Sequence, residues 1–172
     1  MGGKKLFTLS APTKMGHFKL VASSLGLWAV YWPGQKPPAS RLWLPASIAP
    51  PRIARLLKTT ADQLARYFAG QKVCFTASLD SSSLSPFARS VLRALARLPY
   101  GRTTTYGQLA QQIGKPTAAR AIGTVLARNP IPIIIPCHRV VSSDGSLGGF
   151  SAPGGASLKR RLLLMEGNPP RK

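Results

Sequence analysis

The sequence is short of acidic residues: only 4 of its 172 residues are Asp or Glu, against 24 Lys or Arg. The formal net charge of +20 argues against a neutral or acidic housekeeping surface and favours a polyanionic partner such as nucleic acid. The acids are Asp62, Asp80, Asp144 and Glu166. Because 44% of the residues are hydrophobic, the chain can build a packed core and is not merely a basic tail.

Cysteine and histidine are equally scarce. The two cysteines, Cys74 and Cys137, lie far apart and form no C-x-x-C pair, which excludes a disulfide framework and a zinc ribbon. We expect no metal site. Cys74 is predicted to be a packed core thiol, and His17 a surface or half-buried residue.

Long hydrophobic runs are also missing. No apolar stretch approaches the roughly 18 residues that a membrane span requires, and the first residues lack the apolar region of a signal peptide. We therefore expect a soluble cytoplasmic protein with no membrane partner, associated with the nucleoid if its source is a prokaryote.

The first half of the chain mixes aromatic residues, Gly and Pro. Loosely alternating stretches such as Phe18–Ala22 and Gly26–Trp32 predict short strands. From Pro51 apolar residues recur at three- and four-residue spacing, which predicts one or two helices ending near Gly70. A polar linker is expected at about 77–84. Residues 1–80 are thus predicted to form a small antiparallel sheet with a helix.

The second half, 85–172, is predicted to be a mainly helical domain, giving an α/β chain of the α+β kind. Ser85 and Pro86 have the residue types of an N-cap and a first helical position. A second helix is expected over about Tyr106–Ile113 and a third through Arg128. The spacing of Ala110, Gly114 and Ile122 is typical of a helix-turn-helix.

The third helix is expected to turn Ala121, Ile122, Val125 and Leu126 inward. Its other side carries small residues and one long probe, Arg120, and it lacks the side chains that usually read base edges. This pattern indicates a minor-groove reader with little sequence preference. An alternative fits equally well, in which the alanines merely favour helix and Arg120 is a solvated charge.

A chemical cluster follows this helix. An isoleucine-rich segment fenced by prolines, 130–136, precedes Cys137 and His138. Buried cysteine is ordinarily inert, and neighbours on a strand face opposite ways. At a turn or helix start, however, the imidazole can reach the sulfur directly or through water and activate it. Glu166 or Asp144 could then orient the imidazole.

Together these segments resemble the O6-alkylguanine-DNA alkyltransferases. The resemblance extends from about Ser85 to Gly167, and the first half is similar only in general layout. The segments that carry it are Thr105-Tyr106-Gly107-Gln108-Leu109-Ala110, Ala118-Ala119-Arg120-Ala121-Ile122-Gly123, Asn129-Pro130, Ile135-Pro136-Cys137-His138-Arg139-Val140-Val141, Gly148-Gly149-Phe150-Ser151 and Lys159 through Glu166-Gly167.

The resemblance implies a single-turnover methyltransferase that moves the alkyl group of a flipped O6-alkylguanine onto Cys137. His138 would be the base acting through water, Glu166 would hold His138, and Tyr106 would assist base rotation and donate a hydrogen bond. Arg120 would fill the gap left by the base. The resemblance further implies substrate binding by Asn129, Val140, Gly148, Phe150, Ser151 and Lys159. It implies DNA binding by Arg120, Ala118, Ala119, Gly123 and Thr105.

No cofactor is expected, the partner is double-stranded DNA bound through its minor groove, and the chain is expected to be a monomer. Asn129 is expected to bond backbone near Cys137 as a hinge. The run Lys159-Arg160-Arg161 is predicted to be a solvated helix face. Three alternatives remain open: a damage sensor that transfers nothing, a helix-turn-helix regulator, and a cysteine hydrolase.

Overall fold

The computed structural model describes residues 4–38 and 43–169. The chain divides into two compact units, Met1–Ser83 and Leu84–Lys172, which we call the N-terminal unit and the C-terminal unit. Within the described residues no helix is long and apolar enough to cross a membrane.

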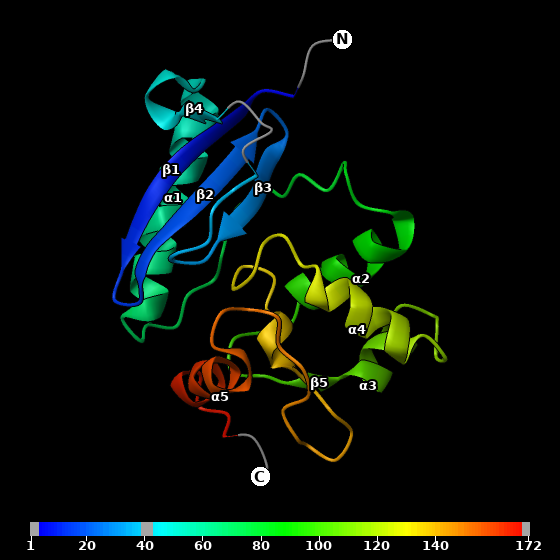
Figure 1. Ribbon diagram of the computed structural model, residues 1–172. Helices are drawn as coiled ribbons and strands as arrows, with labels where there is room; N and C mark the ends of the chain where they lie inside the picture. Colours follow the sequence, from blue (N-terminus) through cyan, green and yellow to red (C-terminus); the bar gives the residue numbers. More distant parts are fainter. Residues whose placement is uncertain (1–3, 39–42, 170–172) are drawn as a thin grey trace. The chain divides into compact units, whose positions relative to one another are not determined.

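The N-terminal unit is a four-stranded sheet with one long helix packed against it (Figure 1). Its elements are β1 (Leu6–Thr13), β2 (Gly16–Ser23), β3 (Gly26–Tyr31), β4 (Trp43–Pro45), the 3-10 turn η1 (Ala46–Ile48) and α1 (Pro51–Phe68). The predicted sheet and helix are confirmed, and the helical pattern after Pro51 belongs to a single helix.

The sheet is mixed, whereas the sequence predicted an antiparallel one. The strand order is β3-β2-β1-β4, and β4 pairs with β1 in parallel. Since β3 and β4 occupy opposite edges, no hairpin joins them. The two hairpin turns place Gly16 and Gly26 at positive φ, 113° and 153°. A side chain at Gly26 would collide with the backbone of Ser78.

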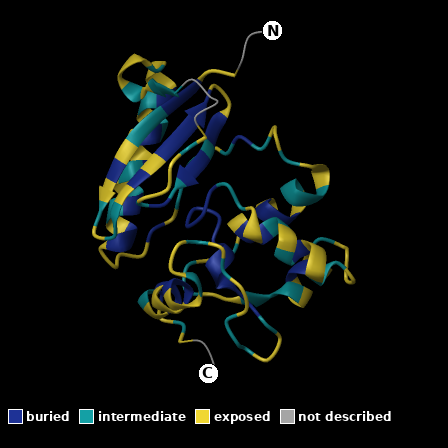
Figure 2. Cartoon of the chain, viewed as in Figure 1, coloured by how far each residue is buried: buried dark blue, intermediate teal, exposed yellow. Residues whose placement is uncertain are grey.

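Aromatic side chains fill the space between the sheet and α1. The ring of Phe18 lies 5.1 Å from that of Trp32 and 5.0 Å from that of Phe68. The strands β2 and β3 are largely buried, as Figure 2 shows. Trp28 and Trp43 are half-buried and pack on a second cluster of Leu6, Val21 and Ala29.

The polar segment at the end of this unit is anchored to β3. Ser78 accepts a hydrogen bond from Leu27 N, and Asp80 N donates to Leu27 O, both at 2.8 Å. The Asp80 carboxylate is buried and binds Lys4, Ser23 and Ser82. These partners hold the pKa of Asp80 well below its usual range, although burial alone would raise it.

Cys74 lies in the extended segment between α1 and Ser78. The prediction that it is a packed core thiol is wrong, because Cys74 is exposed. In this segment the neighbouring Val73 is the side chain that enters the core, with 7% exposure. His17 is exposed, as expected.

The C-terminal unit is mainly helical (Figure 1). Its elements are α2 (Pro86–Ala96), β5 (Thr104–Thr105), α3 (Tyr106–Gln112), α4 (Ala119–Ala127), the 3-10 turn η2 (Cys137–Arg139), β6 (Val140–Val141) and α5 (Gly155–Met165). The predicted cap is confirmed, because the Ser85 side chain accepts a hydrogen bond from Ala88 N. Strands β5 and β6 pair in parallel and bring the start of α3 beside the end of η2.

Helices α3 and α4 form the predicted helix-turn-helix. Ala110 and Ile122 are fully buried, and Gly114 makes the turn with a φ of 68°, where a side chain would be strained. Of the residues expected to point inward, Ile122 and Leu126 are buried and Val125 is half-buried, but Ala121 is exposed. The apolar side of α4 is therefore narrower than its hydrophobic composition suggested.

Candidate active site

The segment before Cys137 is a rigid buried loop. Every residue from Ile131 to Cys137 is buried. Asn129 holds the loop at two points, since its Nδ2 donates to Ile135 O at 2.8 Å and its Oδ1 accepts from Ile131 N at 3.1 Å. Ile133 has a φ of 71°, a left-handed conformation that is costly for a β-branched residue. The loop thus fixes Cys137 at the start of η2, with the expected backbone bond from Asn129 in place.

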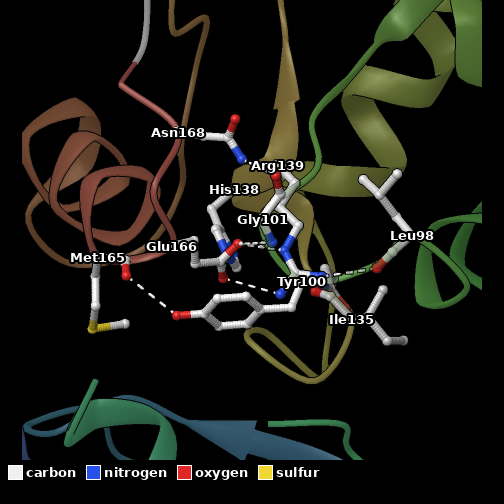
Figure 3. Close-up of polar contacts among 10 residues, drawn as sticks. Leu98, Tyr100, Gly101, Ile135, His138, Arg139, Met165, Glu166 and Asn168 are labelled. Atoms are coloured by element: carbon white, nitrogen blue, oxygen red, sulfur yellow. Dashed lines mark hydrogen bonds and ion pairs between the residues drawn. The ribbon is translucent and has the colours of Figure 1, made fainter. Parts of the chain in front are cut away.

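The only glutamate lies between two residues of η2 (Figure 3). Glu166 Oε1 is 2.9 Å from His138 Nε2, and both Glu166 oxygens accept from the Arg139 guanidinium, at 2.7 and 3.0 Å. All three side chains are buried. Glu166 is the C-cap residue of α5, so this helix positions the carboxylate. Asp144, the other candidate, accepts from Ser146 N in its own loop.

Arg139 is itself tightly held. Its guanidinium donates to Leu98 O at 2.8 Å and lies 5.7 Å from the centre of the Tyr100 ring. Tyr100 in turn donates its hydroxyl to Met165 O at 3.2 Å, next to Glu166 (Figure 3). The carboxylate is therefore fixed by residues from three segments of the C-terminal unit.

The electrostatics of this cluster favour neutral forms of the thiol and the imidazole. Burial raises the pKa of Cys137, although Asn129 and Lys159 oppose that rise. Burial also lowers the pKa of His138, against the opposing effect of Glu166. The positive charge of Arg139 also disfavours an imidazolium at this position. Burial therefore disfavours both the thiolate of Cys137 and the imidazolium of His138, the two charged forms that a proton transfer between them would create.

A cavity of about 460 Å³ opens onto Cys137. Its lining comes from the helix-turn-helix, from η2 and from the loop before α5: Tyr106, Gly123, Leu126, Ala127, Cys137, Gly149, Phe150 and Ser151. Burial raises the pKa of Tyr106, so its phenol stays protonated and can donate. Ser151 Oγ donates to Ala127 O at 2.9 Å, which ties the loop to the end of α4.

Gly148 lets this loop approach Tyr106. Its φ is 64°, and a Cβ placed there would lie 3.4 Å from the Tyr106 hydroxyl oxygen. Gly123 also faces the Tyr106 ring, because a Cβ placed there would lie 3.8 Å from Cε1 of Tyr106. Gly123 therefore belongs to the cavity wall, which its assignment to the DNA-facing side of the helix did not predict.

Lys159 is buried with no carboxylate beside it among the contacts of the described residues. Its Nζ donates to Val140 O at 2.6 Å, to Leu147 O and to Gly149 O at 3.4 Å. The expectation of a solvated Lys159 is wrong, because the first turns of α5 bury this face, while Arg160 and Arg161 are exposed as predicted. Burial lowers the pKa of Lys159 to about 8. The ammonium fixes both ends of the 140–149 segment.

The exposed side of the helix-turn-helix carries the remaining predicted residues. Arg120 is exposed on α4, and Ala118 and Ala119 are half-buried at its start. Thr105 caps α3 in a capping box, accepting from Gln108 N at 3.1 Å while Thr105 N donates to Gln108 Oε1 at 2.9 Å. The cap orients Tyr106, the first residue of α3, toward the cavity.

Comparisons with known proteins identify this arrangement. Residues 86–168 match the family described as 6-O-methylguanine DNA methyltransferase, DNA binding domain. Over 96% of its length the chain superposes on 95% of Mycobacterium tuberculosis OGT, solved in complex with DNA, with a TM-score of 0.74 and 36% identity. The chain belongs to the methylated-DNA–protein-cysteine methyltransferase family.

Other methylated-DNA–protein-cysteine methyltransferases give the same result. The chain is 46% identical to that of Mycolicibacterium paratuberculosis over 112 residues, which are 65% of this chain and 66% of the relative. The O6-methylguanine-DNA methyltransferase of Pyrococcus kodakaraensis is 25% identical, with a TM-score of 0.57 over 94% of this chain and 99% of that one. In sequence, the chain spans about 62–66% of the curated relatives it matches first.

Within this methyltransferase fold, two residues of the buried cluster were not predicted. Arg139 and Tyr100 surround Glu166, but in the sequence Arg139 appears as one more basic residue of a basic chain. Its place next to His138 and the scarcity of acids were the available signals. Val140, predicted to bind substrate, is fully buried, and its carbonyl is bonded to Lys159. In the described residues there is no group of three potential metal ligands.

Proposed function

We propose that the protein repairs O6-alkylguanine in duplex DNA by transferring the alkyl group to Cys137, once per molecule. The observation that carries the proposal is a cysteine that lines a cavity while the next residue, His138, is bonded to a buried carboxylate. Membership of the methyltransferase family supports the same reaction. The cavity wall offers an aromatic residue, Phe150, and a donor, Tyr106, for a guanine base.

The proposed step is a displacement at the sp³ carbon of the alkyl group. The Cys137 thiol gives its proton to His138 through water, and the thiolate attacks the carbon opposite O6. A sulfur–carbon bond forms as the carbon–O6 bond breaks, and the electron pair of that bond goes to guanine. Tyr106 donates a proton to the departing base and regains one from His138, so guanine and S-alkylcysteine are the products. Protons and electrons balance within these groups.

Access to the base requires that it leave the helical stack. We propose that α4 lies in the minor groove, where its small residues Ala118 and Ala119 permit close approach and Arg120 fills the gap left by the flipped base. Apart from Arg120, no side chain on this face is of a type that reads base edges with two hydrogen bonds, so little sequence preference is expected. The net charge of +20 supplies attraction to phosphates that salt weakens.

The decisive experiment is intact-mass analysis after incubation with DNA that contains O6-methylguanine. We expect one added methyl group per chain, located on the peptide with Cys137. Cys137→Ala removes the transfer, and Cys74→Ser, the matched control at the exposed thiol, does not. Label elsewhere, or product in excess of protein, contradicts the proposal.

A second experiment tests the flipping role of Arg120. Arg120→Ala is expected to slow transfer from duplex DNA by about 10-fold or more, because unstacking a base costs a few kcal/mol. Reaction with free O6-benzylguanine should be unchanged, since no base has to be flipped. Equal losses on both substrates would remove Arg120 from this role.

A further inference from the structure

The N-terminal unit carries a groove that has no part in the proposed chemistry. It lies between the first half of α1 and the extended segment 76–78 and has a volume of about 420 Å³. We call it the α1 groove. It is lined by Arg52, Arg55, Leu56, Thr59, Thr60, Thr76, Ala77 and Ser78.

Both walls of the α1 groove are fixed. Gln63, in the middle of α1, donates to Cys74 O and Thr76 Oγ1, both at 3.1 Å, and accepts from Thr76 N. At the other end, the backbone bonds between Leu27 and the 78–80 segment join the wall to β3. A groove whose walls are held in this way needs little reorganisation to receive a ligand.

The polar groups in the α1 groove are donors of the kind that bind phosphate. Arg52 and Arg55 lie one turn apart on the exposed face of α1, and the hydroxyls of Thr59, Thr76 and Ser78 are also exposed. Guanidinium groups bind phosphate oxygens through two parallel hydrogen bonds, and hydroxyls add further ones. In addition, Arg52 lies in the first turn of α1, where the helix dipole favours anions.

No carboxylate opposes these arginines in the lining. The nearest acid along the helix, Asp62, is seven residues beyond Arg55, which is about 10 Å of helix. Asp80, which follows the wall segment, is buried and paired with Lys4. The positive potential of the groove is therefore not cancelled locally.

The charge of the whole unit agrees with this assignment. Residues 1–83 hold 11 Lys or Arg against 2 acids, a net +9. Nearly half of the chain's positive charge is thus outside the unit that carries Cys137. A DNA contact made by the C-terminal unit alone would leave the positive charge of residues 1–83 without a role.

We propose that the α1 groove binds backbone phosphates of nucleic acid, giving the N-terminal unit a DNA contact of its own. The groove is open to solvent, and its lining includes two arginines as well as apolar residues such as Leu56 and Ala77. An open groove with two guanidinium groups suits a repeating phosphodiester chain better than an enclosed small molecule. Such a contact positions without reading sequence. It would help a protein with little sequence preference to stay on DNA while it searches.

The test is the salt dependence of binding to undamaged duplex DNA, measured by fluorescence anisotropy on the full chain. The double variant Arg52→Gln, Arg55→Gln should reduce the slope of log K against log[salt] by about 1 to 2, one phosphate being worth about 0.9. The double variant Lys58→Gln, Arg66→Gln is the matched control, because it removes two exposed basic residues of the same helix that lie outside the groove lining. It should change the slope much less.

Equal changes in the groove variant and the control would show an effect of net charge and overturn the proposal, as would an unchanged slope. A parallel NMR titration with inorganic phosphate distinguishes binding of free phosphate from binding of DNA phosphates. If the groove binds free phosphate saturably, the double variant loses that binding and the DNA slope does not change, the groove is a small-anion site and the proposal is contradicted. Alkyl transfer from free O6-benzylguanine should be unchanged in each variant. If the unaltered chain shows no such transfer, the proposed function is refuted, whereas the proposal that the α1 groove binds DNA is not.

Discussion

Each unit of the protein buries one of its two acids and leaves the other exposed. Asp80 is buried in the N-terminal unit and Glu166 in the C-terminal unit, at 4% and 6% exposure. Asp80 binds an ammonium and two serine hydroxyls. Glu166 binds a guanidinium and an imidazole, and the residue before that imidazole in the chain is Cys137, which lines a cavity.

The comparison shows how the same chemical group serves two purposes. Asp80 connects Lys4, which precedes β1, and Ser23, at the end of β2, to the 78–82 segment, so its interactions stabilise the fold. Glu166 bonds both Arg139 and His138, so its interactions also influence the protonation of the imidazole next to Cys137 in the chain. The partners of a buried carboxylate, more than its burial, determine whether it has a role in chemistry.

Among variants of these charged residues, Glu166→Gln is expected to have the largest effect. The amide cannot accept both Arg139 hydrogen bonds, and a buried guanidinium without its counter-ion costs about 3 kcal/mol of unfolding free energy. Because His138 loses its fixed partner, alkyl transfer from free O6-benzylguanine should fall by about 100-fold. Single-turnover labelling at a temperature where the variant is folded measures this rate.

Asp144→Asn provides the control for Glu166→Gln, since Asp144 is an exposed acid of the same unit. It should leave both the rate and the stability essentially unchanged. A folded Glu166→Gln variant with the rate of the unaltered protein would contradict the role assigned to Glu166 and would remove the contrast between the two buried acids.

This contrast was only partly predictable from the sequence. The pairing of Glu166 with His138 could be anticipated, because the chain has a single glutamate in the right place for the resemblance. The role of Arg139 was not predicted, because in a chain with 24 basic residues only its place next to His138 and the scarcity of acids suggested that it pairs with Glu166. Lys159 was misjudged for a similar reason: the pattern Lys-Arg-Arg does not reveal that the lysine ammonium donates to three backbone carbonyls.

The fold was more predictable where local chemistry determines it. Ser85-Pro86 and Gly114 mark helix ends through capping and through a left-handed turn, and both are found where expected. The parallel strand β4 depends on a connection between opposite sheet edges, a long-range feature with no local signal. Cys74 was misplaced because burial of a short extended segment depends on which residues face the core.

A second comparison concerns one lysine of each unit. Lys4 is partly exposed and paired with Asp80, whereas Lys159 is fully buried among carbonyls. Lys159→Met should free the 140–149 segment and shift Gly149 in the cavity wall, slowing alkyl transfer by about 10-fold, the effect of a small misplacement of reacting groups. The rate of labelling by O6-benzylguanine measures it, with the exposed Arg160→Gln as the matched control.

The pH dependence of stability offers an independent check on Lys159. Its pKa is about 8 in the folded chain and 10.5 in the unfolded one, so between these values the unfolded state binds more protons. The unaltered protein should therefore gain stability relative to Lys159→Met as pH rises from 8 to 10.5. Thermal unfolding of both chains measures the difference, and a difference that is constant with pH contradicts the assignment of a buried ammonium.

The smallest effect on alkyl transfer is expected from Asp80→Asn. The asparagine loses the ion pair with Lys4 and weakens the bonds to Ser23 and Ser82, which should cost about 2 kcal/mol of unfolding free energy at pH 7. Because the pKa of Asp80 is lower in the folded chain than its usual 3.8, this stabilisation is present above about pH 4 and is lost as pH falls further. The folded variant should label Cys137 at the unaltered rate, since none of its partners belongs to the cavity. A loss of labelling comparable to that of Glu166→Gln would mean that the two buried carboxylates are coupled, and the distinction between a structural and a chemical acid would fail.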